Sequence, residues 1–205
     1  MRRFVTLATL VAAALFPPLA LPAYGAPPAY GNHIAAQPLE LCVNGGFENL
    51  LGGEWQVTLP DSASTFVRGT ECEPDPDYEG CLLKTDLSGT ARVDQLLPLP
   101  GIDTRFSVKV RLWSESGSVS WAAAAVIVGF VDEGGLTLGE TAICNFTRWC
   151  PWESRPDFHV IEVGAGVWET HTLDVAAELA TYLPAVDPTA VHSLRLSLST
   201  TMDDC

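Results

Sequence analysis

From residue 38 onward, the apolar residues of the chain fall into short runs separated by turn-forming residues. In two runs, 105–113 and 194–199, apolar and polar residues alternate, which is typical of a half-buried antiparallel strand. The runs interpreted as strands are 39–43, 55–59, 65–68, 81–85, 91–97, 105–113, 119–131, 136–144, 158–163, 167–175 and 191–198. Their short length and close spacing predict an all-β fold, an antiparallel β-sandwich.

Two segments depart from the alternating pattern. The run WAAAAVIVGFV at 121–131 is apolar on both faces, so we expect a central strand covered on both sides. A buried helix is the alternative, but Gly129 and the β-branched residues disfavour it. The segment DVAAELATYL at 174–183 is amphipathic, begins at a capping-type Asp174 and ends before Pro184. It predicts one short helix within the sandwich.

The N-terminus has the composition of an export signal. Arg2 and Arg3 precede an apolar run at 4–21, which ends in small residues. This order predicts a secretory signal peptide at 1–25 that is removed from the mature protein. A permanent membrane anchor is the alternative, but Pro17 and Pro18 interrupt the run and no charged stop-transfer segment follows it.

The predicted signal determines the expected domain organisation. Residues 26–37 are rich in Ala and Pro and predict a flexible leader, which leaves a single domain at 38–205. We therefore expect a secreted or cell-surface protein that does not contact a membrane after the signal is removed.

The charge excludes two classes of partner. The chain carries a formal net charge of -14, and loss of Arg2 and Arg3 would make it -16, because residues 1–25 contain no Asp or Glu. Nucleic-acid phosphates and anionic lipids would both be repelled by such a protein.

The cysteines predict a disulfide framework. All six lie beyond the predicted signal, and an even number in an exported chain favours bridges over catalytic thiols. The sequence leaves the pairings open, but closeness in the chain favours Cys72 with Cys81 and Cys144 with Cys150. Cys42 and Cys205 are left as a third pair.

The order of several segments resembles a known family. These segments are LCVNGGFE, YEGCLLKT, ARVDQLLPL, RFSVKVRLW, AVIVGFVDEGG, GVWETHTLDV and PTAVHSLRLSLS. Their succession is similar to that of the jelly-roll carbohydrate-binding modules attached to cellulases and xylanases, which belong to the galactose-binding-like β-sandwiches. The resemblance covers most of 38–205. It implies a non-catalytic module that binds a polysaccharide or glycan, with a catalytic domain as a potential partner.

The resemblance also implies a structural calcium. In such modules the Asn-Gly-Gly-Phe-Glu corner places its aromatic residue in the core and its acidic residue beside a calcium ion. Here these are Phe47 and Glu48, and a carboxylate beside exposed carbonyls suits calcium chemically. The alternative is that Glu48 is a surface residue after a turn.

The end of the sequence departs from the family pattern. Family members usually finish with another strand that carries an Asp ligand, whereas this sequence stops at TTMDDC. Either Asp203 or Asp204 takes the role of that ligand, or the last strand is missing, which would leave an open sheet edge and an incomplete metal site.

Glycan recognition needs flat apolar rings framed by hydrogen-bonding groups. One candidate group is Lys109, Arg111 and Trp113 on the polar face of one strand, with Trp121 opposite if 114–120 forms a hairpin. A second candidate group is the set of aromatic and basic residues in the loop CNFTRWCPW, which a bridge from Cys144 to Cys150 would stiffen; its members are Phe146, Arg148, Trp149 and Trp152.

Other aromatic residues have structural interpretations. The Trp residues of both candidate groups could also simply cover the sandwich, and we expect Trp55 and Trp168 to pack in the core. The chain lacks the common nucleophile, phosphate-loop and zinc-protease motifs, and its four histidines are scattered. The leading hypothesis is a non-catalytic glycan-binding module. The alternatives are a structural or adhesive surface sandwich without a sugar site, and a small glycoside hydrolase.

Overall fold

The computed structural model describes residues 6–16, 42–70, 78–86, 88–115 and 120–204. The leader predicted at 26–37 therefore lies outside the described residues, as do Cys72 and Cys205.

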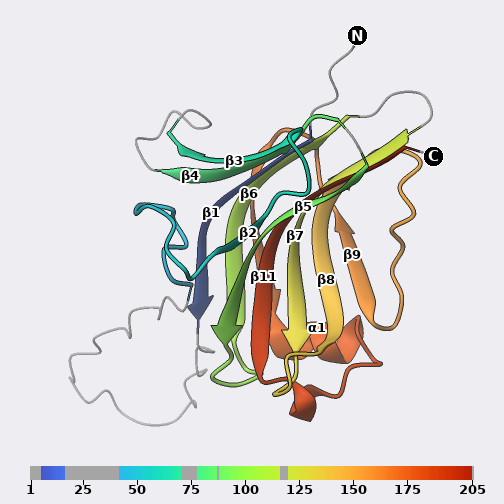
Figure 1. Ribbon diagram of the computed structural model, residues 1–205. Helices are drawn as coiled ribbons and strands as arrows, with labels where there is room; N and C mark the ends of the chain where they lie inside the picture. Colours follow the sequence, from blue (N-terminus) through green and yellow to red (C-terminus); the bar gives the residue numbers. More distant parts are fainter. Residues whose placement is uncertain (1–5, 17–41, 71–77, 87, 116–119, 205) are drawn as a thin grey trace, which may run out of the picture.

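The described chain forms two sheets (Figure 1). One has five strands in the order β10-β6-β1-β4-β3, and the other has six in the order β2-β5-β11-β7-β8-β9. The strands are β1 (Thr6–Phe16), β2 (Gln56–Thr58), β3 (Ser64–Gly69), β4 (Glu79–Lys84), β5 (Gly89–Pro98), β6 (Arg105–Ser114), β7 (Ser120–Val131), β8 (Thr137–Phe146), β9 (Phe158–Glu162), β10 (Trp168–Asp174) and β11 (Ser193–Asp204). Among these strands every pairing is antiparallel except that of β8 with β9. The protein is an all-β sandwich, as its sequence predicts.

The N-terminal part of the described chain contains a strand that the sequence did not predict. The segment Thr6–Phe16, which lies within the predicted signal peptide, forms β1 in the middle of the five-stranded sheet. It ends directly before Pro17 and Pro18, and proline cannot donate a ladder hydrogen bond. The strand predicted at 39–43 is wrong for its last two residues, because Cys42 lies in a bend and Val43 in a turn.

The predicted short helix is present. Helix α1 (Val175–Thr181) begins after Asp174, whose Oδ1 accepts a hydrogen bond of 3.1 Å from the backbone N–H of Ala177. This is an N-cap, which satisfies a donor that the helix itself leaves unpaired. A single 3₁₀ turn, η1 (Pro188–Ala190), follows before β11.

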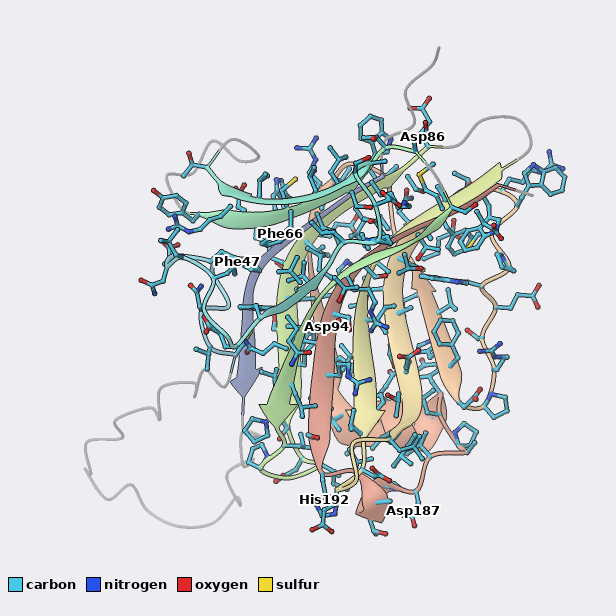
Figure 2. The ribbon with its side chains drawn as sticks, viewed as in Figure 1. Phe47, Phe66, Asp86, Asp94, Asp187 and His192 are labelled. Carbon is cyan, nitrogen blue, oxygen red and sulfur yellow. The ribbon has the colours of Figure 1, made fainter. Side chains whose placement is uncertain are left out.

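A tight corner at residues 44–48 anchors the first part of the sandwich (Figure 2). Asn44 and Phe47 both have positive φ angles, of 53° and 55°. The Phe47 side chain is fully buried, and its ring centroid lies 5.2 Å from that of Trp55 and 5.9 Å from that of Phe66. A Cβ atom at Gly80 would lie 2.7 Å from the Phe47 ring, so only glycine leaves room for this aromatic side chain.

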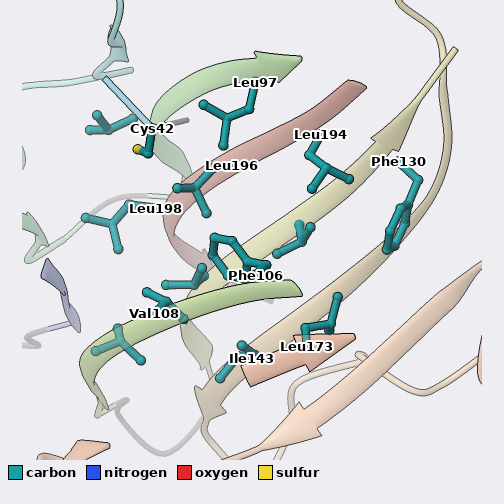
Figure 3. Close-up of a cluster of buried hydrophobic side chains, with 14 of the residues drawn as sticks. Cys42, Leu97, Phe106, Val108, Phe130, Ile143, Leu173, Leu194, Leu196 and Leu198 are labelled. Carbon is teal, nitrogen blue, oxygen red and sulfur yellow. The ribbon is translucent and has the colours of Figure 1, made fainter. Parts of the chain in front are cut away.

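The inner faces of the two sheets form one continuous core (Figure 3). Alternate residues of β6, including Phe106 and Val108, meet Leu194, Leu196 and Leu198 of β11 from the opposite sheet. All five side chains are almost fully buried. The alternating apolar and polar residues of these strands therefore lie on opposite faces of the sheets, with the apolar residues in the core.

Lys84 is a charged residue that is buried within the sandwich. The Lys84 side chain has no solvent exposure, and its Nζ lies 2.7 Å from Oδ2 of Asp61. The hydrogen bond from Lys84 lowers the pKa of Asp61 below its ordinary value of 3.8. The pair ties the end of β4 to the loop before β3.

Within the part of the chain that the structure describes, no helix has the length and apolar character needed to cross a bilayer.

The substitution Asp61→Asn should reduce the free energy of unfolding by about 3 kcal/mol, because it leaves the Lys84 charge buried without its partner. Because the folded-state pKa of Asp61 is lowered, its contribution is present above pH 3.8 and is lost as the pH falls through that lowered value. Urea unfolding between pH 2 and pH 7 measures both effects. The double variant Asp61→Asn, Lys84→Met is the control, and it should recover most of the stability at neutral pH because no charge is then buried.

Candidate functional site

The basic and aromatic residues predicted on β6 share its outer face with residues of β10. In the register of the two strands, Arg111 lies opposite Trp168 and Lys109 opposite Thr170. Lys109 Nζ lies 5.4 Å from the centroid of the Trp168 ring, a cation–π contact. The Trp113 side chain is 36% exposed at the end of the strand. We call this surface, formed by Lys109, Arg111, Trp113, Trp168 and Thr170, the β6–β10 face.

The expectation that Trp168 packs in the core is wrong. Trp168 is half-buried and shares the outer side of the sheet with Arg111, whereas its neighbour Glu169 is registered opposite the buried Val110. A shift of one residue in a strand exchanges the two faces, and the sequence pattern around Trp168 was too polar to define which face is inner. Trp55 is buried as expected, and its Nε1 donates to the carbonyl of Val43 at 3.1 Å.

Trp121 does not join the β6–β10 face. Strands β6 and β7 belong to different sheets and do not pair with each other, so the predicted hairpin between them is absent from the described strand pairings. The Trp121 ring instead makes an edge contact with Trp152, with centroids 6.5 Å apart.

The second candidate group is divided by the structure. Phe146 and Trp152 pack on a small apolar cluster on the outer side of the six-stranded sheet, where Trp152 meets Phe158 at 6.0 Å between ring centroids. They therefore cover the sheet. Arg148 and Trp149 project from the loop, with the Arg148 guanidinium 5.0 Å from the Trp149 ring centroid and the Trp149 side chain 61% exposed.

Cys144 and Cys150 do not form the predicted disulfide. Cys144 is buried in the apolar cluster, whereas Cys150 lies in a turn and donates its backbone N–H to the carbonyl of Thr147 at 3.0 Å. The loop is instead tied to β7, since the backbone N–H of Thr147 donates to the carbonyl of Ala122 and Thr147 Oγ1 accepts from the Ala122 N–H, both at 2.9 Å.

Burial keeps these two thiols protonated. Loss of solvation raises the pKa of Cys144 to about 12, with a further contribution from the neighbouring Cys150, and raises that of Cys150 to about 11. Pairings of Cys72 with Cys81 and of Cys42 with Cys205 each involve a residue outside the described chain and stay predictions.

The corner expected to bind calcium already contains a cation of its own. Arg68 donates from Nε to the carbonyl of Phe47 and from a terminal nitrogen to the carbonyl of Glu48. Its guanidinium carbon lies 3.3 Å from the Tyr78 ring centroid, and the Glu48 carboxylate accepts a hydrogen bond of 3.4 Å from the Tyr78 backbone N–H. A calcium ion at these two carbonyls would lie beside the positive charge of Arg68.

The other predicted calcium ligands do not complete a metal site. Asp203 lies on β11, where its Oδ1 is 3.5 Å from Ser88 Oγ, and the side chain of Asp204 is not described. Within the described residues, no three His, Cys, Asp or Glu side chains gather as a metal site requires. Calcium binding by Glu48, Asp203 or Asp204 stays a prediction from the resemblance.

A pocket that the sequence did not predict lies at one open edge of the sandwich. It has a volume of about 580 Å³ and is bounded by the edge strands β9 and β10 and by α1. We call it the edge pocket. Its lining combines aromatic, acidic, hydroxyl and apolar side chains: His159, Val160, Ile161, Thr172, Leu173, Asp174, Ala177, Glu178, Thr181 and Tyr182.

A buried carboxylate organises the edge pocket. Glu178 Oε1 lies 2.5 Å from His159 Nδ1 and accepts a hydrogen bond of 2.7 Å from Thr141 Oγ1. The His159 ring stacks on Tyr182 with centroids 4.0 Å apart and planes 4° apart, while Tyr182 keeps half of its surface exposed. When Nδ1 carries the proton that is shared with Glu178, Nε2 is the acceptor nitrogen of the neutral ring. The pocket thus combines fixed hydrogen-bonding groups with an accessible aromatic surface.

The helical pattern of the sequence contains one signal for this pocket. Val175, Leu179 and Leu183 occupy the buried stripe of the predicted helix, and Glu178 falls within the same stripe. A carboxylate at such a position requires buried partners. The partners themselves, His159 on β9 and Thr141 on β8, could not be identified from spacing along the chain.

No family model matches this chain, and no curated protein matches it either. The candidate sites therefore rest on their geometry.

The substitution Glu178→Ala should reduce the free energy of unfolding by about 2 kcal/mol, because it removes a shared acceptor from His159 and Thr141. It should also release the His159 ring from its Nδ1–H tautomer, which ¹⁵N NMR of the imidazole would detect. The control is Glu162→Ala at an exposed position of β9, which should change neither the stability nor the spectrum. An unchanged tautomer in Glu178→Ala would contradict the assigned hydrogen bond.

In the native protein at pH 8, Cys144 and Cys150 should react with iodoacetamide about a hundredfold or more slowly than an ordinary cysteine, because so little of either thiol is ionised. After denaturation without reductant both should be alkylated, as mass spectrometry of the peptides would measure. Failure of both to react when unfolded would mean that they form a disulfide after all.

Proposed function

We propose that the protein is a secreted, non-catalytic carbohydrate-binding module that holds itself or a catalytic partner on a polysaccharide or glycan. The observation that carries this proposal is the β6–β10 face, where two indole side chains lie on the same side of a sheet as a guanidinium and an ammonium group. Pyranose rings offer apolar C–H faces to aromatic rings and hydroxyl groups to polar side chains.

The β6–β10 face is suited to a ligand that lies across the strands. Neighbouring strands of a sheet hold their side chains at fixed spacing, so the face loses little conformational entropy when it binds. Lys109 and Arg111 can donate hydrogen bonds to hydroxyl oxygens, and they can also pair with the carboxylates of a uronic-acid polymer. A panel of neutral and acidic polysaccharides distinguishes these two ligand classes.

The edge pocket supports the same function because it adjoins the face along β10. Thr172 lines the pocket, and its hydroxyl lies 3.4 Å from that of Ser107 on the outer side of β6. The exposed ring of Tyr182 and the carboxylate of Asp174 give the pocket a stacking surface and hydrogen-bond acceptors. A glycan chain on the face could place one of its sugar residues in the pocket.

In affinity gel electrophoresis, soluble polysaccharides should retard the protein. Trp113→Ala and Trp168→Ala should each weaken binding about tenfold, because each variant loses about 1.4 kcal/mol of stacking between the indole ring and a sugar. Leu136→Ala is the matched control, since Leu136 is an exposed apolar residue in the turn between β7 and β8, and it should bind as the parent does.

The variant Trp149→Ala separates the two surfaces. Weaker binding in this variant alone would move the site from the β6–β10 face to the loop after β8. Unchanged mobility of the parent protein across the whole panel would reject glycan binding and favour a structural or adhesive surface domain.

A further inference from the structure

Strand β1 occupies a central position in the five-stranded sheet, between β6 and β4 (Figure 1). It pairs with β6 from Thr6 opposite Ser114 to Phe16 opposite Arg105, and with β4 from Thr6 opposite Lys84 to Leu10 opposite Gly80. Both pairings are antiparallel. No other described strand joins β6 to β4, so β1 alone makes these two halves one sheet.

The same residues form the apolar centre of the predicted export signal. If residues 1–25 are removed on export, the five-stranded sheet divides into the pair β10–β6 and the pair β4–β3. An isolated two-stranded ribbon is marginally stable at best, and each newly created edge carries a row of unpaired backbone donors and acceptors.

The two halves cannot simply close on each other. Since β1 is antiparallel to both neighbours, β4 and β6 run parallel to one another, and direct pairing would need a new parallel ladder. They are also separated by two strand spacings, about 9.5 Å, so one half would have to move by about 4.8 Å against the opposite sheet. Close packing in the core opposes such a shift.

Buried residues on both neighbouring strands need a strand between β4 and β6 to shield them from solvent. Leu82 on β4 and Val110 and Leu112 on β6 are almost fully buried, and they lie on the two strands that flank β1. Without an occupant they would border an open slot one strand wide. The position therefore favours an extended segment with apolar residues on its inner face.

We infer that the position between β4 and β6 is an acceptor site, which in the exported protein takes an extended segment from a partner polypeptide by strand addition. The occupant would run antiparallel to both neighbours over about ten residues, matching the β1–β6 ladder, and would contain no proline within that length. Main-chain hydrogen bonds on both sides would supply affinity, and alternate apolar side chains would supply specificity. This inference rests on the predicted removal of residues 1–25 and is independent of glycan binding.

Two forms of the protein test the inference: the full chain produced without export, and the chain that begins at Ala26. The probe is a labelled synthetic peptide of residues 6–16 with lysines added at its ends for solubility. The peptide should bind the Ala26 form saturably, raise its melting temperature and restore hydrogen-exchange protection in β4 and β6. The full chain should not bind the peptide, because β1 already fills the position.

The matched control is the same peptide with Leu10→Pro. Leu10 is registered opposite both Val110 and Gly80, so proline there interrupts both ladders and should weaken binding about a hundredfold. The inference is overturned if the Ala26 form binds neither peptide, if it binds both equally, or if it matches the full chain in stability and in β4 and β6 protection. It is also overturned if the intact mass of the exported protein shows that residues 6–16 are retained.

Discussion

The structure depends on burying the inner faces of two sheets against each other. Each strand contributes alternate side chains to the space between the sheets, and the packing is continuous from Phe106 and Val108 on β6 to Leu194, Leu196 and Leu198 on β11. Each internal strand is hydrogen-bonded on both sides, so its loss would leave unpaired backbone groups on both neighbouring strands. β1 holds such an internal position, between β6 and β4.

Two charged side chains that are buried in this sandwich have polar partners. Lys84 is buried with Asp61, and Glu178 is buried with His159 and Thr141. At the corner after residue 44, Arg68 takes the carbonyls of Phe47 and Glu48 and covers Tyr78. In this protein a guanidinium therefore donates hydrogen bonds to the carbonyl oxygens of this corner.

The candidate binding surfaces lie where the sandwich ends. Strand β10 is the edge of the five-stranded sheet, and its outer side belongs to the β6–β10 face while its C-terminal half borders the edge pocket. Helix α1 closes one side of that pocket and supplies Glu178 and Tyr182. The two candidate surfaces, the β6–β10 face and the concave edge pocket, therefore both include residues of this one strand.

The sequence by itself determined the approximate positions of the strands from β2 onward and the capped helix at Asp174, because side-chain periodicity and capping are local properties. It also placed Lys109, Arg111 and Trp113 together on one strand face, since residues two apart must share a face. Only the tertiary structure decided that Trp168 joins them while Trp121 lies on the other sheet, and that Glu178 meets His159. Those outcomes depend on strand order and register between segments far apart in the chain, which local patterns do not encode. The apolar run at 6–16 is an example of this limit of local patterns. Its composition suits both an export signal and a core strand, and only the folded sheet shows that it pairs with β4 and β6.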